Sequence, residues 1–280
     1  MKKTVLLLAL VLLLSGCGKA AEKTEDANTG AETAYMEFLS GRSSVTTAEC
    51  FRDDDQEYNQ DGLAFGTYTI GEMRSAIAEY EMSESAVKYT FFDFGNDGTE
   101  ELILKFESVD PAFMNWTGII SFDGENLGLN YSYEDGYRTY SVLYDGGYLE
   151  NGGSSGAGAH GYRIVSFDGK GFGTEEYRQN EYYGSFAESI EFDLTGDSNW
   201  EDEHAIPYES GLLVYEYIKD GDVKIAVSGG WSEDAPLRYE EEDYIGYLVS
   251  LGAEQISMEE MNALCSKEKL GAGISIDRSL

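Results

Sequence analysis

Basic residues and proline are scarce in this sequence. Lysine and arginine together number 19 against 53 aspartates and glutamates, so the formal net charge of the 280 residues is −34. Contacts to nucleic-acid phosphates need clustered lysine and arginine, and the composition therefore argues against a nucleic acid as partner. The same imbalance argues against electrostatic docking on anionic lipid. With only 3 prolines, collagen-like and proline-rich linker classes are excluded.

The sequence also lacks an N-terminal apolar run long enough to span a bilayer. Residues 4–14 are uncharged and rich in leucine, but at 1.5 Å per residue they reach only about half of a ~30 Å bilayer core. Two lysines precede this run, and Ser15-Gly16-Cys17 follows it. This order resembles the lipobox of bacterial lipoproteins, which implies a signal peptide at 1–16 and a lipid such as palmitate on Cys17. The alternative is an ordinary secretory signal with a chance cysteine.

Residues 17–33 are predicted to form a lipidated, flexible tether. They contain no aromatic or β-branched apolar residue, so they cannot bury enough surface to fold. Cleavage before Cys17 removes two lysines, and the net charge of the mature chain becomes 17 − 53 = −36. Because an anionic membrane repels so acidic a body, the lipid has to provide the anchor. The expected location is the extracytoplasmic face of the cell membrane.

Two further cysteines, Cys50 and Cys265, lie far apart in the chain. In an exported protein they could form one disulfide. The alternative is two small buried hydrophobic side chains, because both lie in apolar segments that are predicted to be helical.

Helical patterns are predicted at both ends of the folded part. Residues 34–39 form a short helix, and a capping box at 69–72 opens a helix over 70–82. Apolar residues over 244–251 share one helix face, and a second capping box follows at 257–260. The resulting helical segments are 34–84 and 231–280.

Residues 85–230 are predicted to be rich in β-strands. Aromatic and aliphatic runs alternate with Asp-Gly turns, which supply the positive φ angles of tight hairpins. An antiparallel meander with helical ends predicts an α+β fold, with 34–280 as one folded unit. The predicted strands are residues 88–93, 101–107, 117–122, 127–133, 139–144, 161–167, 189–194, 213–218 and 223–227.

A weak internal repeat favours a propeller-like array as the alternative. Residues 120–128 recur as 165–173, which is 45 residues later and typical of a propeller blade. The β-region holds about three such units, whereas small propellers need roughly four or more.

The strongest internal motif is the aspartate-rich turn at 93–102. Asp93 and Asp97 match ligand positions of a calcium loop, and Glu101 could supply a further carboxylate. A glycine and a leucine stand at two other ligand positions, which argues against an EF-hand-type site. The candidate ligands of a weak Ca²⁺ site are therefore Asp93, Asp97 and Glu101. The alternative is a turn in which the aspartates accept hydrogen bonds from nearby amides.

This motif, set between two strands and behind a lipobox, resembles a group of uncharacterised surface lipoproteins from Gram-positive, clostridial-type bacteria. The segment 34–41 and the serine- and glycine-rich loop at 152–161 add to the resemblance. The resemblance implies surface display and no known activity.

The loop 152–161 also matches a catalytic motif. Its first five residues fit the G-x-S-x-G nucleophile elbow, and Ser154 or Ser155 with His160 could form a nucleophile–base pair. The elbow has to lead into a helix, whereas a strand is predicted here. The alternatives are a plain turn and a glycine loop that exposes backbone to a ligand.

Aromatic residues could form a stacking platform for sugar rings. The candidates are Trp116, Trp200 and Trp231, together with some of the 21 tyrosines. The alternative is that these side chains fill half-buried strand positions.

We therefore expect a surface-anchored, non-catalytic binding or structural lipoprotein for an extracellular glycan or protein. A cell-envelope hydrolase with two carboxylates about 5–9 Å apart in a cleft is the second hypothesis. A weak calcium-binding surface protein is the third.

Overall fold

The chain divides into two compact units. Unit 1 comprises Met1–Tyr137, Phe167–Gly173 and Ser275–Leu280, and unit 2 comprises Arg138–Ser166 and Thr174–Ile274. Each unit contains one seven-stranded sheet. The structure is a computed structural model, and it describes residues 18–47, 63–78, 85–110, 113–154, 158–183, 187, 189–195, 212–229 and 239–280.

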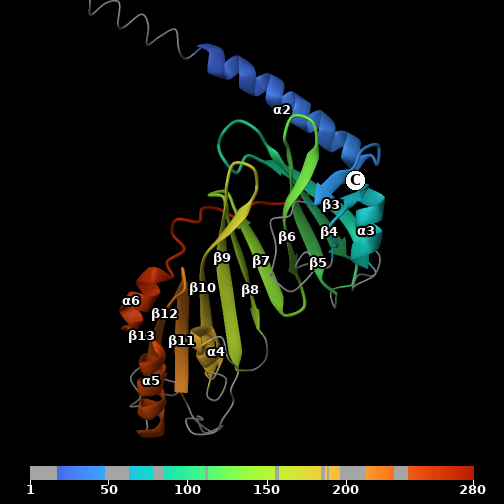
Figure 1. The fold of residues 1–280 in the computed structure, drawn as a ribbon. Coiled ribbons are helices and arrows are strands. Elements are labelled where there is room, and N and C mark those ends of the chain that lie inside the picture. Colours follow the sequence, from blue (N-terminus) through green and yellow to red (C-terminus); the bar gives the residue numbers. More distant parts are fainter. Residues whose placement is uncertain are drawn as a thin grey trace, which may run out of the picture. The chain divides into compact units, whose positions relative to one another are not determined.

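The sheet of unit 1 is mainly an antiparallel meander. Its strands are β1 (Val45–Thr47), β2 (Thr67–Tyr68), β3 (Ser85–Phe92), β4 (Glu101–Ser108), β5 (Asn115–Phe122), β6 (Leu127–Asp135) and β14 (Arg278–Ser279). They lie in the order β14-β3-β4-β5-β6-β1-β2, and Figure 1 labels β3 to β6 of this sheet. Strands β3 to β6 pair antiparallel with their sequence neighbours, whereas β1 joins β6 in parallel.

Two helices, α2 (Gly18–Leu39) and α3 (Ile70–Ala78), pack on one face of this sheet. Tyr35 and Phe38 of α2 and Met73 of α3 are buried in one hydrophobic cluster with Leu104 and Trp116 of the sheet. Side chains two residues apart in a strand point to the same face, so β4 contributes every second residue to this cluster. Each such side chain stabilises the fold by about 1.5–3 kcal/mol when it leaves water.

The structure places most of the expected tether in helix α2. The helix begins at Gly18 and continues through the predicted helix at 34–39. Alanine, glutamate and lysine, which are strong helix formers, are frequent in this stretch. Ala31, Tyr35 and Phe38 recur at helical spacing and are buried. Polar composition therefore did not distinguish a flexible linker from a helix.

The sheet of unit 2 is also mainly an antiparallel meander. Its strands are β7 (Thr139–Tyr144), β8 (Tyr148–Ser154), β9 (Ala159–Phe167), β10 (Gly173–Tyr183), β11 (Leu212–Lys219), β12 (Asp222–Gly229) and β13 (Glu254–Gln255). They lie in the order β13-β12-β11-β10-β9-β8-β7 (Figure 1). The residues at the ends of β9 and β10, Phe167 and Gly173, are grouped with unit 1.

The two faces of this sheet are covered by different segments. Helices α4 (Ser189–Thr195) and α5 (Tyr239–Leu251) pack against one face, in a cluster that contains Val214. Helix α6 (Met258–Leu264) and Leu270 pack in a second cluster, which contains Tyr177 and Tyr217. Val214 and Tyr217 are an odd number of residues apart in β11, so they point to opposite faces.

These observations confirm the α+β fold and the antiparallel meander. The capping boxes are confirmed as well: Ser257 and Glu260 exchange hydrogen bonds at the start of α6, and Thr69 and Glu72 do so at the start of α3. The propeller alternative is wrong, because the described strands form two seven-stranded sheets rather than four-stranded blades.

The predicted strand at 189–194 is wrong, because α4 occupies this segment. The sequence here alternates apolar and polar residues, which is the pattern of a strand; the apolar residues are Ile190, Phe192 and Leu194. Ile190 and Leu194 are four residues apart, and both contact the cluster beneath α5, which is the spacing of one helix face. Strands β1, β2, β8, β10, β13 and β14 had not been predicted.

Candidate functional site

The aspartates of the 93–102 motif cap their own turn. The carboxylate of Asp93 accepts hydrogen bonds from the backbone N–H groups of Asp97 at 3.1 Å and Gly98 at 2.8 Å. The carboxylate of Asp97 accepts one from the N–H of Thr99 at 2.8 Å. This is the geometry expected of an aspartate turn between two strands.

Glu101 is the buried carboxyl group of this motif. Its side chain begins β4, the residue is only 1% exposed, and Oε2 accepts a hydrogen bond from the N–H of Phe94 at 3.1 Å. Burial raises the pKa of Glu101 to about 8, and the negative charges of Asp93 and Asp97 add to this effect. Glu101 is therefore largely protonated at neutral pH.

The 93–98 turn packs closely against the turn that follows Phe167, within unit 1. A Cβ atom on Gly95 would lie 2.4 Å from the Cα of Gly169, so only glycine allows this approach. The rings of Phe94 and Phe167 are 4.9 Å apart. The motif thus serves as a packing contact between two turns.

The weak repeat of residues 120–128 and 165–173 is also explained by turn chemistry. Asp123 Oδ1 accepts hydrogen bonds from the N–H groups of Glu125 and Asn126. Asp168 Oδ1 accepts them from Lys170 and Phe172. Both copies are aspartate-capped turns that follow a strand.

The described residues contain no group of three or more histidine, cysteine, aspartate or glutamate side chains that could hold a metal ion. Asp93, Asp97 and Glu101 lie near one another, but both oxygens of Asp93 and Oδ1 of Asp97 accept backbone amide hydrogen bonds, and Glu101 is largely protonated at neutral pH. The calcium site stays a prediction.

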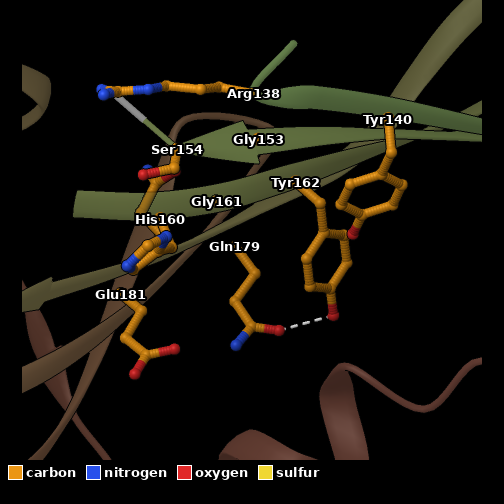
Figure 2. A pocket seen from close by; sticks show the side chains of 10 residues that line it. Arg138, Tyr140, Gly153, Ser154, His160, Gly161, Tyr162, Gln179 and Glu181 are labelled. Atoms are coloured by element: carbon orange, nitrogen blue, oxygen red, sulfur yellow. Dashed lines mark hydrogen bonds between the residues drawn. The ribbon is translucent and has the colours of Figure 1, made fainter. Parts of the chain in front are cut away.

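A pocket opens on the sheet of unit 2, at the ends of β7, β8, β9 and β10 (Figure 2). Its volume of about 320 Å³ is at the lower end of the range for small-ligand sites. The lining residues are Arg138, Tyr140, Gly153, Ser154, His160, Gly161, Tyr162, Gln179, Asn180 and Glu181.

One end of the pocket is aromatic. Tyr140 and Tyr162 are the cross-strand neighbours of Gly152 on either side, so all three lie on one face of the sheet. A Cβ atom on Gly152 would lie 2.8 Å from Tyr140 Cζ and from Tyr162 Cβ. The absent side chain lets the Tyr140 ring lie across the strand, where the residue is 43% exposed. The Tyr162 hydroxyl donates a hydrogen bond to Gln179 Oε1 at 2.5 Å.

The tyrosine end rests on the buried carboxylate of Glu150. This residue is 4% exposed and accepts hydrogen bonds from the Tyr140 hydroxyl at 2.6 Å, the Tyr144 hydroxyl at 2.9 Å and Lys267 Nζ at 2.6 Å. Burial alone would raise the pKa of Glu150, but these hydrogen bonds and the lysine charge outweigh it and lower the pKa. Glu150 therefore stays ionised and fixes the Tyr140 ring.

The other end of the pocket carries the polar groups. Figure 2 shows the guanidinium of Arg138 with Ser154, His160 and Glu181 on the side away from the tyrosine rings. Glu181 accepts a hydrogen bond from the Tyr183 hydroxyl at 2.6 Å. Among the lining residues, Glu181 is the only carboxylate.

Ser154 and His160 face each other across the β8–β9 pair. A strand, β9, follows the glycine-rich loop, so the strand-to-helix turn of a nucleophile elbow is absent. Ser155 lies outside the described residues. Both ends of the segment 152–161 lie in strands, because residues 152–154 belong to β8 and residues 159–161 to β9.

A second hollow of unit 2 lies at the turn between β11 and β12 and contains three carboxylates. Glu175 is 2.7 Å from Arg178, and Glu176 is 3.8 Å from Lys219 and accepts a hydrogen bond from Ser166. Two of the three carboxylates are thus engaged in surface ion pairs. Carboxylates that pair with surface cations do not match the two facing carboxyl groups that glycoside hydrolysis needs in a cleft.

The predicted tryptophan platform is wrong at Trp116, which is fully buried in unit 1 and stacks on Phe106 at 5.5 Å. Trp200 and Trp231 lie outside the described residues. Cys265 is half-buried, and burial raises the pKa of its thiol. Cys50 lies outside the described residues, so the disulfide stays a prediction.

Sequence reasoning missed the pocket because it missed two of its strands, β8 and β10. The alternation of Tyr140, Val142 and Tyr144 in β7 was the available signal for an aromatic face.

Comparisons with protein-family models, curated proteins and solved structures find no match to this chain. Among the described residues, no helix is both long and apolar enough to cross a bilayer.

We predict that Glu101 makes unit 1 less stable as the pH rises. A carboxyl pKa that is raised on folding gives stability that is complete below the unfolded pKa and is lost as the pH approaches about 8. Between about pH 5 and pH 8 the loss should be about 3 kcal/mol. Urea unfolding should show that Glu101→Gln removes most of this dependence, because an amide oxygen can still accept the Phe94 N–H. The exposed control Glu125→Gln should retain it, and parallel pH profiles for wild type and Glu101→Gln would contradict the prediction.

We also predict that calcium leaves the stability of the protein unchanged. Three of the four oxygens of Asp93 and Asp97 already accept amide hydrogen bonds, and Glu101 is a poor ligand while it is protonated. Thermal unfolding with calcium and with a chelator should give equal midpoints. A calcium-dependent rise that Asp93→Asn abolishes would establish the site instead.

Proposed function

We propose that this protein is a membrane-anchored, extracytoplasmic binding protein that takes a saccharide in the pocket of unit 2. The lipobox-like order of residues 1–17 supports the anchor. The pocket residues support the saccharide, because they combine an exposed aromatic ring with hydrogen-bonding groups at fixed positions.

The exposed ring of Tyr140 is the observation that carries this proposal. The ring crosses Gly152, and its hydroxyl is held by Glu150 at 2.6 Å, so its orientation is fixed before a ligand arrives. A fixed aromatic surface loses little conformational entropy on binding. The exposed face of the Tyr140 ring can stack on the apolar face of a pyranose. The polar rim of the sugar is then left to the hydrogen-bonding groups of the pocket.

The polar residues match the rim of a sugar. Arg138 is a donor, Gln179 is both donor and acceptor, and Glu181 is an acceptor, which is the mixture that hydroxyl groups need. A protein ligand would favour a broader apolar surface than this pocket provides.

Binding without catalysis is favoured over hydrolysis. Glycoside hydrolysis uses two carboxyl groups on opposite sides of the scissile bond. The pocket lining contains one, Glu181, and the carboxylate of Glu150 lies buried beneath the tyrosines. This favours the non-catalytic hypothesis over the hydrolase hypothesis.

A lipid anchor on Cys17 is consistent with the charge of the body. A mature net charge of 17 − 53 = −36 gives no attraction to an anionic surface, so retention would depend on acyl chains. Surface display, as the resemblance to clostridial-type lipoproteins implies, would expose the pocket to envelope or environmental glycans.

The saccharide proposal predicts that Tyr140→Ala weakens glycan binding by about tenfold or more, because an exposed aromatic anchor is lost. Tyr140→Phe should retain most of the affinity, since it keeps the ring. The ligand would be identified by screening the detergent-solubilised full chain on a glycan array, and affinities would be measured by calorimetry. Phe65→Ala, a change at an exposed aromatic residue in unit 1, is the matched control and should have no effect. An array without a bound glycan would contradict the proposal.

The anchor proposal predicts that a radiolabelled fatty acid is incorporated into the wild-type protein and not into Cys17→Ala. The thiol is the acceptor of the lipid, so its removal leaves no attachment point. Labelling of bacterial cultures followed by immunoprecipitation measures this directly. Equal labelling of the two proteins, or no labelling of either, would refute the anchor without bearing on the pocket.

A further inference from the structure

An ammonium group already lies beside the pocket. Lys267 Nζ is 2.6 Å from Glu150 Oε1 and 4.1 Å from the centroid of the Tyr162 ring. A carboxylate together with an aromatic face is the combination that recognises ammonium groups, through a charge-assisted hydrogen bond and a cation–π contact. These groups form an ammonium site, which we define as Glu150, Tyr140, Tyr144 and Tyr162.

The ammonium site is continuous with the pocket. Tyr140 and Tyr162 line the pocket, and the same two residues contact Glu150 and Lys267. In Figure 2 their rings lie at the end of the pocket away from Arg138 and His160. A ligand seated on the Tyr140 ring would therefore present its nearest substituent to this site.

Lys267 is held there by an exposed segment. Residues 266–269 are all exposed, and the side chain of Lys267 is 40% exposed, whereas that of Glu150 is 5% exposed. The segment is anchored by the buried residues Met261 and Leu270 on either side. Moving the lysine side chain into water would leave a buried carboxylate that has lost its cation. A second cation would compensate that loss.

We infer that the ammonium site accepts the amino group of a saccharide with free amines, and that Lys267 occupies the site until such a ligand displaces it. The inference rests on the proposed saccharide function and adds the chemical class of the sugar, a hexosamine without N-acetylation. The acidic body, with its net charge of −34, favours the approach of a cationic ligand. N-acetylation would remove the charge, so the sugar could not displace Lys267 from Glu150.

The test compares a β-1,4-linked tetramer of glucosamine with its fully N-acetylated counterpart. Calorimetry with the detergent-solubilised full chain would be run at mildly acidic pH, where the amines are protonated and Glu150 is still ionised. We expect wild type to prefer the free amine by about tenfold, because only the amine can replace Lys267 on Glu150 and the acidic body attracts its charge. Lys267→Gln should bind the amine about tenfold more tightly than wild type, because it removes the internal competitor and keeps much of the lysine stem.

Lys269→Gln is the matched control. Lys269 lies in the same exposed segment, with Nζ 5.3 Å from the Tyr148 ring, and among the described residues it does not donate a hydrogen bond to Glu150. It should leave both affinities unchanged. Glu150→Gln should abolish the preference for the amine.

The inference would be overturned if wild type bound the two tetramers equally, or if Lys267→Gln bound the amine more weakly than wild type. Binding of the N-acetylated sugar would still support the proposed function. Failure to bind either tetramer, combined with an empty glycan array, would refute both. If Lys267→Gln does not fold by circular dichroism, the comparison of the two tetramers on wild type decides the question alone.

Discussion

A carboxylate that is withdrawn from water needs hydrogen-bond donors, and Glu150 finds three of them on other side chains. Two of the donors are tyrosines of the edge strand β7, and the third is Lys267 from the segment after α6. By binding these groups, the carboxylate fixes the Tyr140 ring and ties the C-terminal segment to the sheet. The aromatic end of the pocket thus depends on one buried charge.

The two buried glutamates of this chain illustrate how surroundings decide protonation. Glu101 faces Asp93 and Asp97, and it receives one backbone N–H, so burial and like charges leave it largely neutral at neutral pH. Glu150 is buried to a similar degree but receives a lysine and two hydroxyl groups, so it stays charged. Glu101 therefore supports a packed turn, whereas the negative charge of Glu150 favours a cation beside it.

The strands with strong local signals could be predicted from the sequence, and so could both capping boxes. Asp-Gly turns and β-branched runs mark β11 and β12, because a tight hairpin depends on neighbouring residues alone. Strand β8 lacks such signals, because the need for glycine at 152 comes from Tyr140 and Tyr162 on the adjacent strands. The alternation in α4 was misleading because tertiary contacts of Ile190 and Leu194 determine its conformation. The pocket could not be foreseen, because it depends on the register of four strands.

The chain passes between the two units four times, at residues 137–138, 166–167, 173–174 and 274–275. Its last residues return to unit 1 and add the edge strand β14 beside β3. Neither unit is therefore a contiguous stretch that proteolysis or truncation could release intact. A chain synthesised from its N-terminus emerges with β3 early and β14 last, so the first sheet reaches its full width only after the whole of the second unit has been made.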